Sequence, residues 1–375
     1  MMEKWIKGMD LSSLPEVELC GGRFYDQGRQ EDPIEILKRY GMNLVRLRLW
    51  NDPYGPDGAP YGAGTNDLPR TVRMARRLKR AGLDWMLDLH YSDFWADPGK
   101  QIMPKAWQGM DPARVEQAVY DYTVSVLDTL RAQDALPGIV AVGNEITNGL
   151  LWPYGKYPHF EAITAFLNAG IRAVRQAAPE SRVMLHLDNG GRNDLYRDWF
   201  DRYFAAGGSG FDYLGLSYYP FWHGTMEQLR QNMNDLALRY HKDMVVVETS
   251  MGYTLEDYAE YEGLGPERRK GMAANAKLSE SIGYPMSRAG QCRFLQDLME
   301  LIREVPEERG KGFVYWEPAW IPVPGSQWAN EAGLAYTGER GPGGNEWANQ
   351  ALFDYHGNAL PALKTIRDFP ERRSL

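Results

Sequence analysis

Cysteine is scarce in this chain of 375 residues, where Cys20 and Cys292 are the only two and lie far apart. Neither belongs to a CxxC pair, the spacing that cysteine zinc sites usually show. The scarcity argues against a disulfide framework and against a structural zinc site.

Runs of basic residues are also missing. The chain has 42 Lys and Arg against 50 Asp and Glu, which gives a formal net charge of −8. A surface that binds a polyanion needs the opposite balance, so we expect no nucleic acid partner.

Long apolar segments are absent as well. No stretch is apolar for long enough to span a bilayer, so we expect no membrane partner. The first residues, MMEKWIKGMDLS, contain no apolar core of a secretory signal. We therefore expect a cytoplasmic protein, and the alternative is a secreted protein whose leader has been removed.

Aromatic residues, in contrast, are abundant, with 12 Trp and 22 Tyr. Both have an apolar face and a polar group, which suits a surface that meets a half-apolar ligand such as a sugar ring. We expect about half of them to fill the core instead, since Trp and Tyr are often mostly buried.

Eight short apolar runs predict strands. They span residues 6–10, 43–50, 83–91, 138–145, 182–189, 211–220, 243–250 and 312–318. Several are apolar throughout, as strands covered on both faces are. Helical spacing appears between them, for example at 33–41 and in the segments from Pro112 and Phe160.

Strand and helix alternating eight times predict an α/β fold, a single (β/α)8 TIM barrel that occupies residues 1–375. A doubly wound sheet is the alternative, but no glycine-rich phosphate loop follows the first run. Two long loops are expected, at residues 251–290 after the seventh strand and 319–350 after the eighth. We expect the charged loop 251–290 to be solvated surface, with a lid as the second interpretation.

Polar side chains follow most of these runs, at the strand ends where barrel enzymes carry their active sites. They are Asp10, Arg46, Arg48, Asp88, His90, Asn144, Glu145, His186, Asp188, Tyr218, Tyr219, Glu248, Trp316 and Glu317. Such a convergence of polar types predicts one catalytic mouth.

Glu145 and Glu248 stand out because they end the fourth and seventh runs. We expect their carboxylates to enter one cleft from opposite sides. Glycoside hydrolysis needs such a pair, one carboxyl to protonate the leaving oxygen and one carboxylate to attack the anomeric carbon. The second GNE triplet, which ends at Glu346, lacks a preceding strand, so Trp347 beside it is the better candidate for sugar contact.

Neighbouring residues suit this division of roles. Asn144 is placed to bond a sugar 2-hydroxyl. Arg46 and one tyrosine of Tyr218 and Tyr219 would keep Glu248 ionised. We expect His186 to bond Glu145, and Trp316 to floor the sugar site.

Other interpretations remain open at this level. A glutamate at a strand end is often only a salt-bridge partner, and His90 and His186 are individually typical of hydrogen-bonded core histidines. Asp88 and His90 have metal-ligand spacing, but the first run has no H-x-H, so we predict no metal site. Glu317 is a rival carboxylate that we place on an outer wall.

The chain resembles the arabinogalactan endo-β-1,4-galactanases of glycoside hydrolase family 53 over nearly its whole length. The resemblance is carried by GMDLS, NLVRLRLWNDP, DLHYSDFWADPGKQ, PKAWQGM, VAVGNEITNGLLWPYGK, LHLDNGGRN, LGLSYYPFWHGT, VVVETSMGYT, GFVYWEPAWIP and NEWANQALFDYHGNALPAL. It implies that Glu145 is the acid/base and Glu248 the nucleophile of a retaining enzyme that cleaves inside β-1,4-galactan, type I arabinogalactan or derived galacto-oligosaccharides.

The resemblance also implies aromatic sugar subsites and no organic cofactor. The aromatic residues are Trp95, Trp152, Trp222, Trp316, Trp320 and Trp347. Some bacterial relatives hold calcium in the loop after the seventh strand; here that loop reads YTLEDYAEYEGLGPERRKG and lacks their pattern, so it does not support calcium. A β-mannanase or xylanase, and a silent sugar-binding barrel, are the alternatives, and the oligomeric state stays open.

Overall fold

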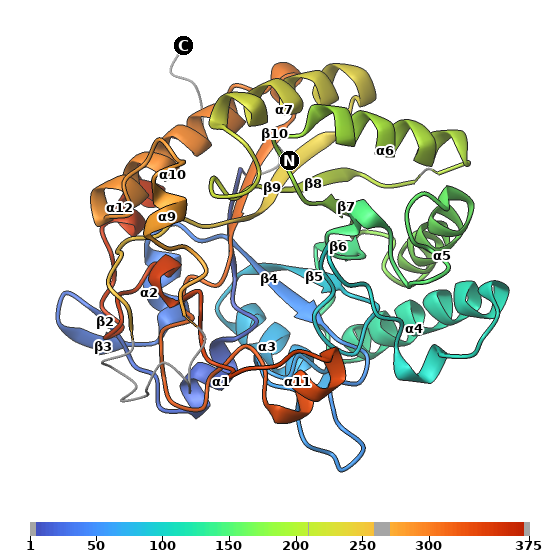
Figure 1. The fold of residues 1–375 in the computed structure, drawn as a ribbon, viewed down its shortest axis with the longest axis horizontal. Coiled ribbons are helices and arrows are strands. Elements are labelled where there is room, and N and C mark those ends of the chain that lie inside the picture. Colours follow the sequence, from blue (N-terminus) through green and yellow to red (C-terminus); the bar gives the residue numbers. More distant parts are fainter. Residues whose placement is uncertain (1–4, 209, 259–270, 371–375) are drawn as a thin grey trace.

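The computed structural model describes residues 5–208, 210–258 and 271–370. Its centre is a closed barrel of parallel strands, viewed in Figure 1 from the end that carries the long loops. The strands are β1 (Ile6–Asp10), β4 (Leu44–Leu49), β5 (Asp84–Leu89), β6 (Ile139–Val142), β7 (Arg182–Leu187), β8 (Tyr213–Ser217), β9 (Asp243–Thr249) and β10 (Gly310–Tyr315). Pairing of β1 with both β4 and β10 closes the ring. The predicted (β/α)8 barrel is confirmed, with a strand in each of the eight apolar runs.

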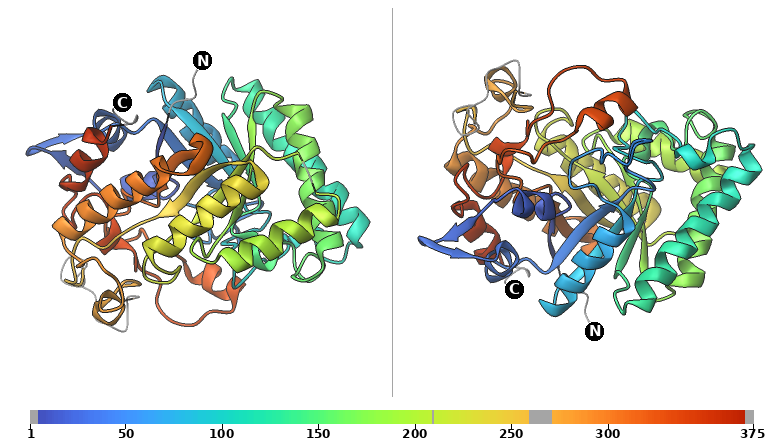
Figure 2. Two further views of the ribbon diagram at one scale, coloured as in Figure 1. Left: turned by 90° about the horizontal axis from the view of Figure 1, so that it is seen from above. Right: turned by 90° about the horizontal axis from the view of Figure 1, so that it is seen from below.

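Helices surround the strands on the outside of the barrel (Figures 1 and 2). They are α1 (Leu14–Leu19), α2 (Pro33–Arg39), α3 (Leu68–Arg80), α4 (Pro112–Ala132), α5 (Phe160–Ala177), α6 (Asn193–Ala205), α7 (Met226–Tyr240), α9 (Ala276–Ser279), α10 (Arg288–Arg303), α11 (Glu331–Thr337) and α12 (Ala362–Asp368). Short 3₁₀ turns are η1 (Lys105–Trp107), η2 (Ile146–Asn148), η4 (Pro306–Glu308) and η5 (Ala348–Gln350).

Several helices begin at a capping aspartate followed by proline in the first turn. Asp32, Asp67 and Asp111 each accept a hydrogen bond from a backbone N–H of the first turn. Proline suits this turn because its missing N–H would have no partner there. These local signals fix where α2, α3 and α4 start.

Two apolar layers hold the barrel together. The interior of the barrel is filled by Ile6, Leu44, Met86, Ile139, Ala141, Met184, Tyr213, Val245, Val247 and Val314. The alternate strand residues face the helices and join the larger outer core. Both faces of each strand are therefore buried, which explains why the runs in the sequence are apolar throughout.

A small hairpin lies outside the barrel and was not predicted. Strands β2 (Phe24–Asp26) and β3 (Arg29–Glu31) pair in antiparallel fashion between α1 and α2. Each has only three residues and β3 is wholly polar, so neither produces a periodic pattern.

The two long loops after β9 and β10 are present as predicted, and their described parts pack on each other. Asn349 Nδ2 donates to the carbonyl oxygens of Thr254 (3.2 Å) and Ala274 (2.9 Å). Tyr258 is fully buried, and its hydroxyl accepts from the Asn345 N–H at 3.1 Å. The expectation of plain solvated surface for residues 251–290 is therefore wrong for these positions, while residues 259–270 lie outside the described part.

Within the described residues, no helix has both the length and the apolar character that crossing a membrane requires.

Candidate active site

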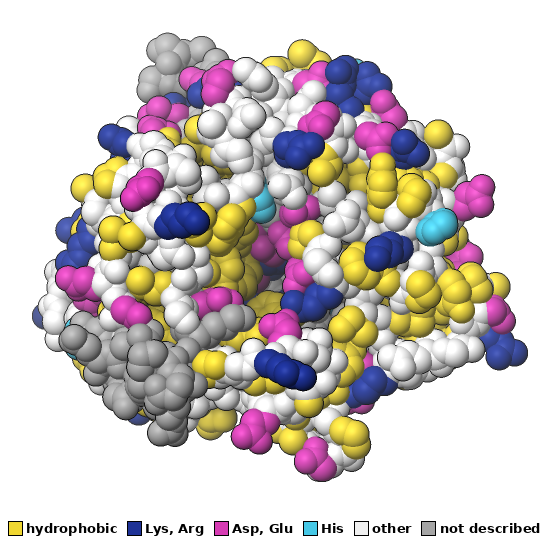
Figure 3. Space-filling view, viewed as in Figure 1, with side chains coloured by type: hydrophobic (Ala, Val, Ile, Leu, Met, Phe, Trp, Pro, Cys, Tyr) yellow, Lys and Arg dark blue, Asp and Glu magenta, His cyan; other side chains and the backbone are white. Residues whose placement is uncertain are grey.

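The strand ends open into a cavity of about 320 Å³ at the mouth of the barrel. Figure 3 shows it as a central hollow with acidic and hydrophobic side chains on its walls. Thirteen residues of the predicted mouth and sugar subsites line it, namely Arg46, Arg48, His90, Trp95, Asn144, Glu145, Asp188, Tyr219, Trp222, Glu248, Trp316, Trp320 and Trp347. Sequence reasoning did not single out Asp97, Lys100, His223, Trp328 and Glu339, which also line it, because most of them lie in loops without a pattern.

Glu145 and Glu248 lie together in this cavity, from β6 and β9. A carboxylate oxygen of each lies within 4.8 Å of the other. β6 and β9 are three steps apart in the ring of eight strands, one step short of directly opposite, with β7 and β8 between them on one side. The two carboxylates therefore enter the mouth from strands that lie nearly across the ring from each other.

The backbone at Glu145 is left-handed, with φ of 46°. This conformation is uncommon for residues other than glycine, and it occurs in turns and at active sites. It follows directly on Gly143 and Asn144, where the apolar strand stops. The turn redirects the chain so that consecutive residues both reach the cavity.

Glu248 is held by one cation and one hydroxyl. Arg46 Nη1 lies 2.7 Å from its Oε1, and the Tyr219 hydroxyl donates to Oε2 at 3.1 Å. Burial raises the pKa of Glu248 to about 7, while Arg46 and the Tyr219 hydrogen bond oppose that rise. Arg46 and a tyrosine therefore favour the ionised form, as the sequence predicted, and the tyrosine is Tyr219.

Glu145 retains its proton more strongly. Burial raises its pKa well above the usual range, and the negative charges of Glu248 and Asp188 raise it further. Among the described residues, no cation pairs with it as Arg46 pairs with Glu248. The two carboxyls thus differ in protonation as a proton donor and a nucleophile must.

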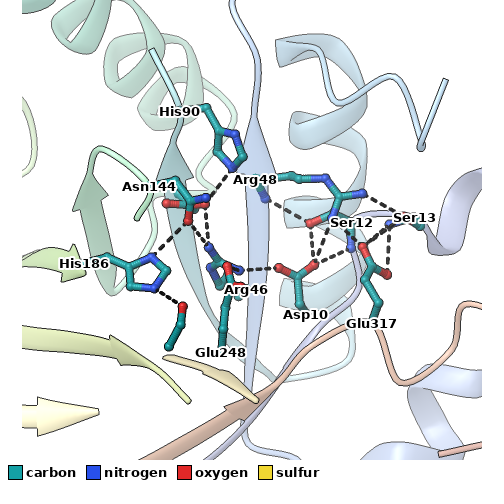
Figure 4. A network of polar contacts seen from close by, with 12 residues as sticks. Asp10, Ser12, Ser13, Arg46, Arg48, His90, Asn144, His186, Glu248 and Glu317 are labelled. Atoms are coloured by element: carbon teal, nitrogen blue, oxygen red, sulfur yellow. Dashed lines mark hydrogen bonds and ion pairs between the residues drawn. The ribbon is translucent and has the colours of Figure 1, made fainter. Parts of the chain in front are cut away.

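Arg46 is the centre of a buried network (Figure 4). Besides Glu248, it donates to Asp10 at 2.9 Å, to Asp88 at 2.7 Å and to Asn144 Oδ1 at 2.7 Å. Asp10 also accepts from the Ser12 N–H and hydroxyl. Asp10 is fully buried and does not line the cavity, so its predicted contact with substrate is replaced by a supporting contact with Arg46.

His186 also lies below the cavity floor. Its Nδ1 lies 2.9 Å from Asn144 Oδ1 and its Nε2 lies 2.8 Å from Ser217 Oγ. The Ser217 hydroxyl in turn lies 2.6 Å from Glu145 Oε1. The expected direct bond between His186 and Glu145 is therefore absent, and Ser217, which the sequence analysis passed over, stands between them.

His90 and Asp88 bond each other rather than sharing a metal. His90 Nε2 lies 3.0 Å from Asp88 Oδ2, while Nδ1 accepts from Trp50 Nε1 and the Ala96 N–H, both at 3.2 Å. Nδ1 is thus an acceptor and Nε2 carries the hydrogen. Both ring nitrogens of His90 are therefore hydrogen-bonded within the protein, and the ring forms part of the cavity wall.

Glu317 lies in a second buried ion pair, not on an outer wall. It accepts from the Ser13 N–H at 3.0 Å and the Ser13 hydroxyl at 2.9 Å, and it pairs with Arg48. It is 3% exposed and does not line the cavity. Its expected position is therefore corrected, and the structure removes it as a rival to Glu145 and Glu248.

Comparison with known proteins places this architecture in a family. The sequence profile of Glycosyl hydrolase family 53 matches residues 6–366. The chain belongs to glycosyl hydrolase family 53. It is therefore a glycosidase, a hydrolase that acts on O-glycosyl bonds.

Individual relatives agree. The chain is 45% identical to an uncharacterized protein in the bgaB 5′ region of Niallia circulans, with 85% of each chain covered. It is 34% identical to an endo-β-1,4-galactanase of Bacillus subtilis (strain 168), covering 98% of this chain and 86% of that one. The Ignisphaera aggregans GH53 catalytic domain superposes with a TM-score of 0.88 at 39% identity, covering 97% and 96% of the two chains.

Aromatic rings cover the cavity of this family 53 enzyme on several sides. Trp316 and Trp347 meet edge to face with centroids 4.6 Å apart, and Trp347 also contacts Trp222. Trp222 is 42% exposed, so much of its surface is available to a ligand. Trp95 is fixed from below, because its Nε1 donates to the Trp328 carbonyl oxygen at 3.0 Å.

Besides Asp10 and His186, two more predicted binding residues lie outside the cavity. Trp152 lines a separate hollow with Met103 and Tyr154, and Lys156 Nζ sits 4.3 Å above its ring. The Tyr218 ring stacks on Phe294, and its hydroxyl donates to the Gly224 carbonyl. The structure therefore places neither in the cavity, and Tyr218 faces the helices because side chains alternate along an extended strand.

Only one group of three potential metal ligands occurs among the described residues, and it consists of Glu145, His186 and Glu248. His186 Nε2 is already engaged by Ser217 and its pKa is lowered well below the usual value by burial. The group therefore consists of the carboxyl pair Glu145 and Glu248 with a histidine that is hydrogen-bonded beside it. Part of the loop weighed for calcium, residues 259–270, lies outside the described residues.

Proposed function

We propose that the chain is a retaining endo-β-1,4-galactanase that acts on galactan, type I arabinogalactan or the galacto-oligosaccharides derived from them. The closeness of Glu145 and Glu248 carries the proposal. Retaining glycosidases hold their carboxyl groups about 5–5.5 Å apart, whereas inverting ones leave a wider gap for water. Family membership and the galactanase relatives support the substrate.

In the first half-reaction Glu248 attacks the anomeric carbon while Glu145 gives its proton to the departing oxygen. Arg46 and Tyr219 each bond one oxygen of Glu248, which fixes its orientation and favours the ionised form before attack. Glu145 is the protonated partner because burial and two neighbouring negative charges raise its pKa.

In the second half-reaction a water molecule attacks the glycosyl–Glu248 ester. Glu145, now ionised, takes the proton of that water and is restored to its starting form. Glu248 leaves as a carboxylate and regains its contact with Arg46. The two displacements together retain the anomeric configuration.

Two polar groups are placed to bind sugar hydroxyls. Oδ1 of Asp188 is buried and has no hydrogen-bond partner within the described part of the chain, while Oδ2 accepts from Asn189. Asn144 Nδ2 gives one hydrogen to the Ala96 carbonyl and has a second for substrate. An unpartnered buried oxygen is costly, so a substrate hydroxyl donated to Asp188 would bind favourably.

The first test is a substrate panel. We expect purified protein to release reducing ends from β-1,4-galactan and to lower the viscosity of the polymer early, as internal cleavage does. Mannan and xylan should remain intact. Activity on mannan or xylan without activity on galactan would contradict the substrate, and galactan binding without any product would indicate a silent sugar-binding barrel.

The second test assigns the two carboxylates through azide rescue with a dinitrophenyl β-1,4-galactobioside. In Glu248→Ala, azide should replace the missing nucleophile and give the α-glycosyl azide. In Glu145→Ala, azide should attack the glycosyl-enzyme from the other face and give the β-glycosyl azide. The reverse pattern of anomers, or full activity in Glu248→Ala without azide, would overturn the roles.

A further inference from the structure

Ser217 is the last residue of β8 and lies completely buried between Glu145 and His186. Its hydroxyl oxygen lies 2.6 Å from Glu145 Oε1 and 2.8 Å from His186 Nε2. A serine hydroxyl has a single hydrogen to donate. It can therefore donate to only one of these two neighbours at a time.

The orientation of Asn144 decides which nitrogen of His186 carries hydrogen. Asn144 Oδ1 accepts from Arg46, which can only donate, and Nδ2 donates to the Ala96 carbonyl oxygen. The amide oxygen therefore faces His186 Nδ1, at 2.9 Å. Nδ1 must donate, so in the neutral ring Nε2 is an acceptor that needs a hydrogen from Ser217.

Neutral His186 is the form that its surroundings favour. The ring is fully buried, and burial together with the nearby charge of Arg46 lowers its pKa well below the usual value. If Ser217 gives its hydrogen to His186, its oxygen presents only lone pairs to Glu145. With Glu145 ionised, the 2.6 Å contact is a hydrogen bond that Ser217 donates. With the Ser217 hydrogen on His186, the same contact needs a hydrogen from the protonated Glu145 carboxyl.

We infer that Ser217 and His186 form a relay that holds Glu145 in its protonated form before bond cleavage, with the Ser217 hydroxyl reversing its direction once Glu145 has given up its proton. In the resting state hydrogen bonds run from Glu145 to Ser217, to His186 and on to Asn144. After proton transfer to the leaving oxygen, Ser217 donates to the Glu145 carboxylate and His186 Nε2 loses its donor.

This inference rests on the proposed function and assigns Ser217 and His186 as positioning residues for it. When Glu145 is ionised, His186 Nε2 loses the hydrogen bond from Ser217. The loss of that hydrogen bond favours the return of a proton from water to Glu145 in the second half-reaction. The relay thus makes the unprotonated state of Glu145 short-lived without touching the substrate.

Other charged groups act on Glu145 as well and must stay constant in a test. They are Glu248 from β9, Asp188 after β7, Asp97 from the loop after β5, and Arg46 from β4 through its contact with Asn144. Tyr219 and Tyr196 are the nearby phenols; burial raises the pKa of both, and nearby carboxylates, Glu145 among them, raise it further. None of these is altered by the substitutions below.

The test compares two amides at position 186. His186→Asn keeps a donor near the place of Nδ1 but removes the acceptor at Nε2, so Ser217 is released to donate to Glu145. His186→Gln reaches the place of Nε2 and retains an acceptor for Ser217. We expect the alkaline limb of kcat/KM against pH to move toward acid by roughly one pH unit in the Asn variant, the size of one redistributed hydrogen bond.

The Gln variant should keep its limb within a few tenths of a unit of the native enzyme. His186→Leu also removes the acceptor and fills the space, so no water can replace it; it serves if His186→Asn fails to unfold cooperatively. Adding His186→Asn to the Ser217→Ala variant should leave the alkaline limb of kcat/KM where Ser217→Ala has it. The hydroxyl that would transmit the effect of His186 to Glu145 is gone in this background. Ser217→Thr, which keeps the hydroxyl, should keep the alkaline limb at its native position.

An unchanged limb in folded His186→Asn and His186→Leu would overturn the relay. So would an equal shift in the Ser217→Ala background, since the effect of His186 would then bypass the hydroxyl. The profiles are measured on whichever β-glycan the native enzyme cleaves, because a dinitrophenyl leaving group would depart without a proton from Glu145. Failure of the galactan assignment therefore appears in the native enzyme alone and is distinct from failure of the relay.

Discussion

At the scale of single residues, Asp188 is one of the charged groups that raise the pKa of Glu145. Its pKa is raised to about 6, mainly by burial, so it is ionised at neutral pH and adds to the pKa of Glu145. Glu145 works when protonated, so activity falls as pH rises through its pKa. Asp188→Asn should lower that pKa and move the alkaline limb of kcat/KM toward acid by about one pH unit.

The acid limb provides the internal control for this prediction, because it reports the ionisation of Glu248 and should move less. Asp194→Asn is the matched surface change, since Asp194 is largely exposed and pairs with Arg192 on α6. It should leave both limbs unchanged. An alkaline limb in Asp188→Asn that stays in place would show that Asp188 does not contribute to the protonation of Glu145.

Individual side chains at the strand ends were predictable to different degrees. The polar residues of the mouth follow apolar strands, so the sequence alone located Glu145, Glu248, Asn144 and Arg46. The sequence did not indicate Ser217 as a site residue, because serine is common and the role of this one depends on two partners from other strands. The alternation of side chains along an extended strand could have decided between Tyr218 and Tyr219. It places Tyr219 on the same side as Ser217 and Tyr218 on the other side.

At the scale of elements, helix α5 sets the position of the strand end that delivers Glu145. A Cβ on Gly170 would lie 2.6 Å from Val142 Cγ1 at the end of β6 and 2.8 Å from the Tyr91 hydroxyl. Gly170→Ala should therefore push the strand end and cost about 1–2 kcal/mol of unfolding free energy, despite the better helix propensity of alanine. Denaturant unfolding measures the loss, and kcat should fall with it.

Gly138→Ala is the matched control, placed just before β6. A Cβ there meets only the Trp85 carbonyl oxygen at 3.8 Å, which is an ordinary contact. It should change the unfolding free energy by less than about 0.5 kcal/mol. Equal stability of both variants would mean that α5 moves freely away from β6.

Elements were predictable where a periodic pattern existed. All eight barrel strands follow from apolar runs, the starts of α2 and α4 from capping residues, and α5 from its apolar stripe. The hairpin at residues 24–31 has strands too short to produce a pattern. The packing of Tyr258 under the loop after β10 depends on residues nearly a hundred positions away, so no local signal could indicate it.

At the scale of the whole molecule, buried acids make stability depend on pH. Burial raises the pKa of Glu317 to about 8 and that of Glu248 to about 7, with Arg48 and Arg46 opposing the rise. Such a carboxyl stays protonated in the folded chain while its unfolded form has ionised, so the unfolding free energy falls as pH rises up to the folded pKa. His186 and His223 have lowered pKa values and act in the opposite sense below pH about 6.5.

Between pH 6.5 and 8, therefore, the acids alone should control the slope. We expect the unfolding free energy to decrease across this window, and Glu317→Gln to remove about 2 kcal/mol of the decrease, from one group at 1.36 kcal/mol per pH unit. Glutamine keeps the bond from the Ser13 N–H, so the variant should match the native protein near pH 6.5. Denaturant unfolding at four pH values across the window measures this.

Glu307→Gln is the control, because Glu307 is exposed and the Arg309 hydrogen bond lowers its pKa, so its ionisation is complete below the window. Its slope should equal that of the native protein. Catalysis adds a second readout, since Glu317 lies outside the cavity and Glu317→Gln should keep its turnover at pH 6.5 while Glu248→Gln loses it. Parallel stability profiles for Glu317→Gln and the native protein would show that Glu317 is already ionised beside Arg48 in the folded chain at pH 6.5.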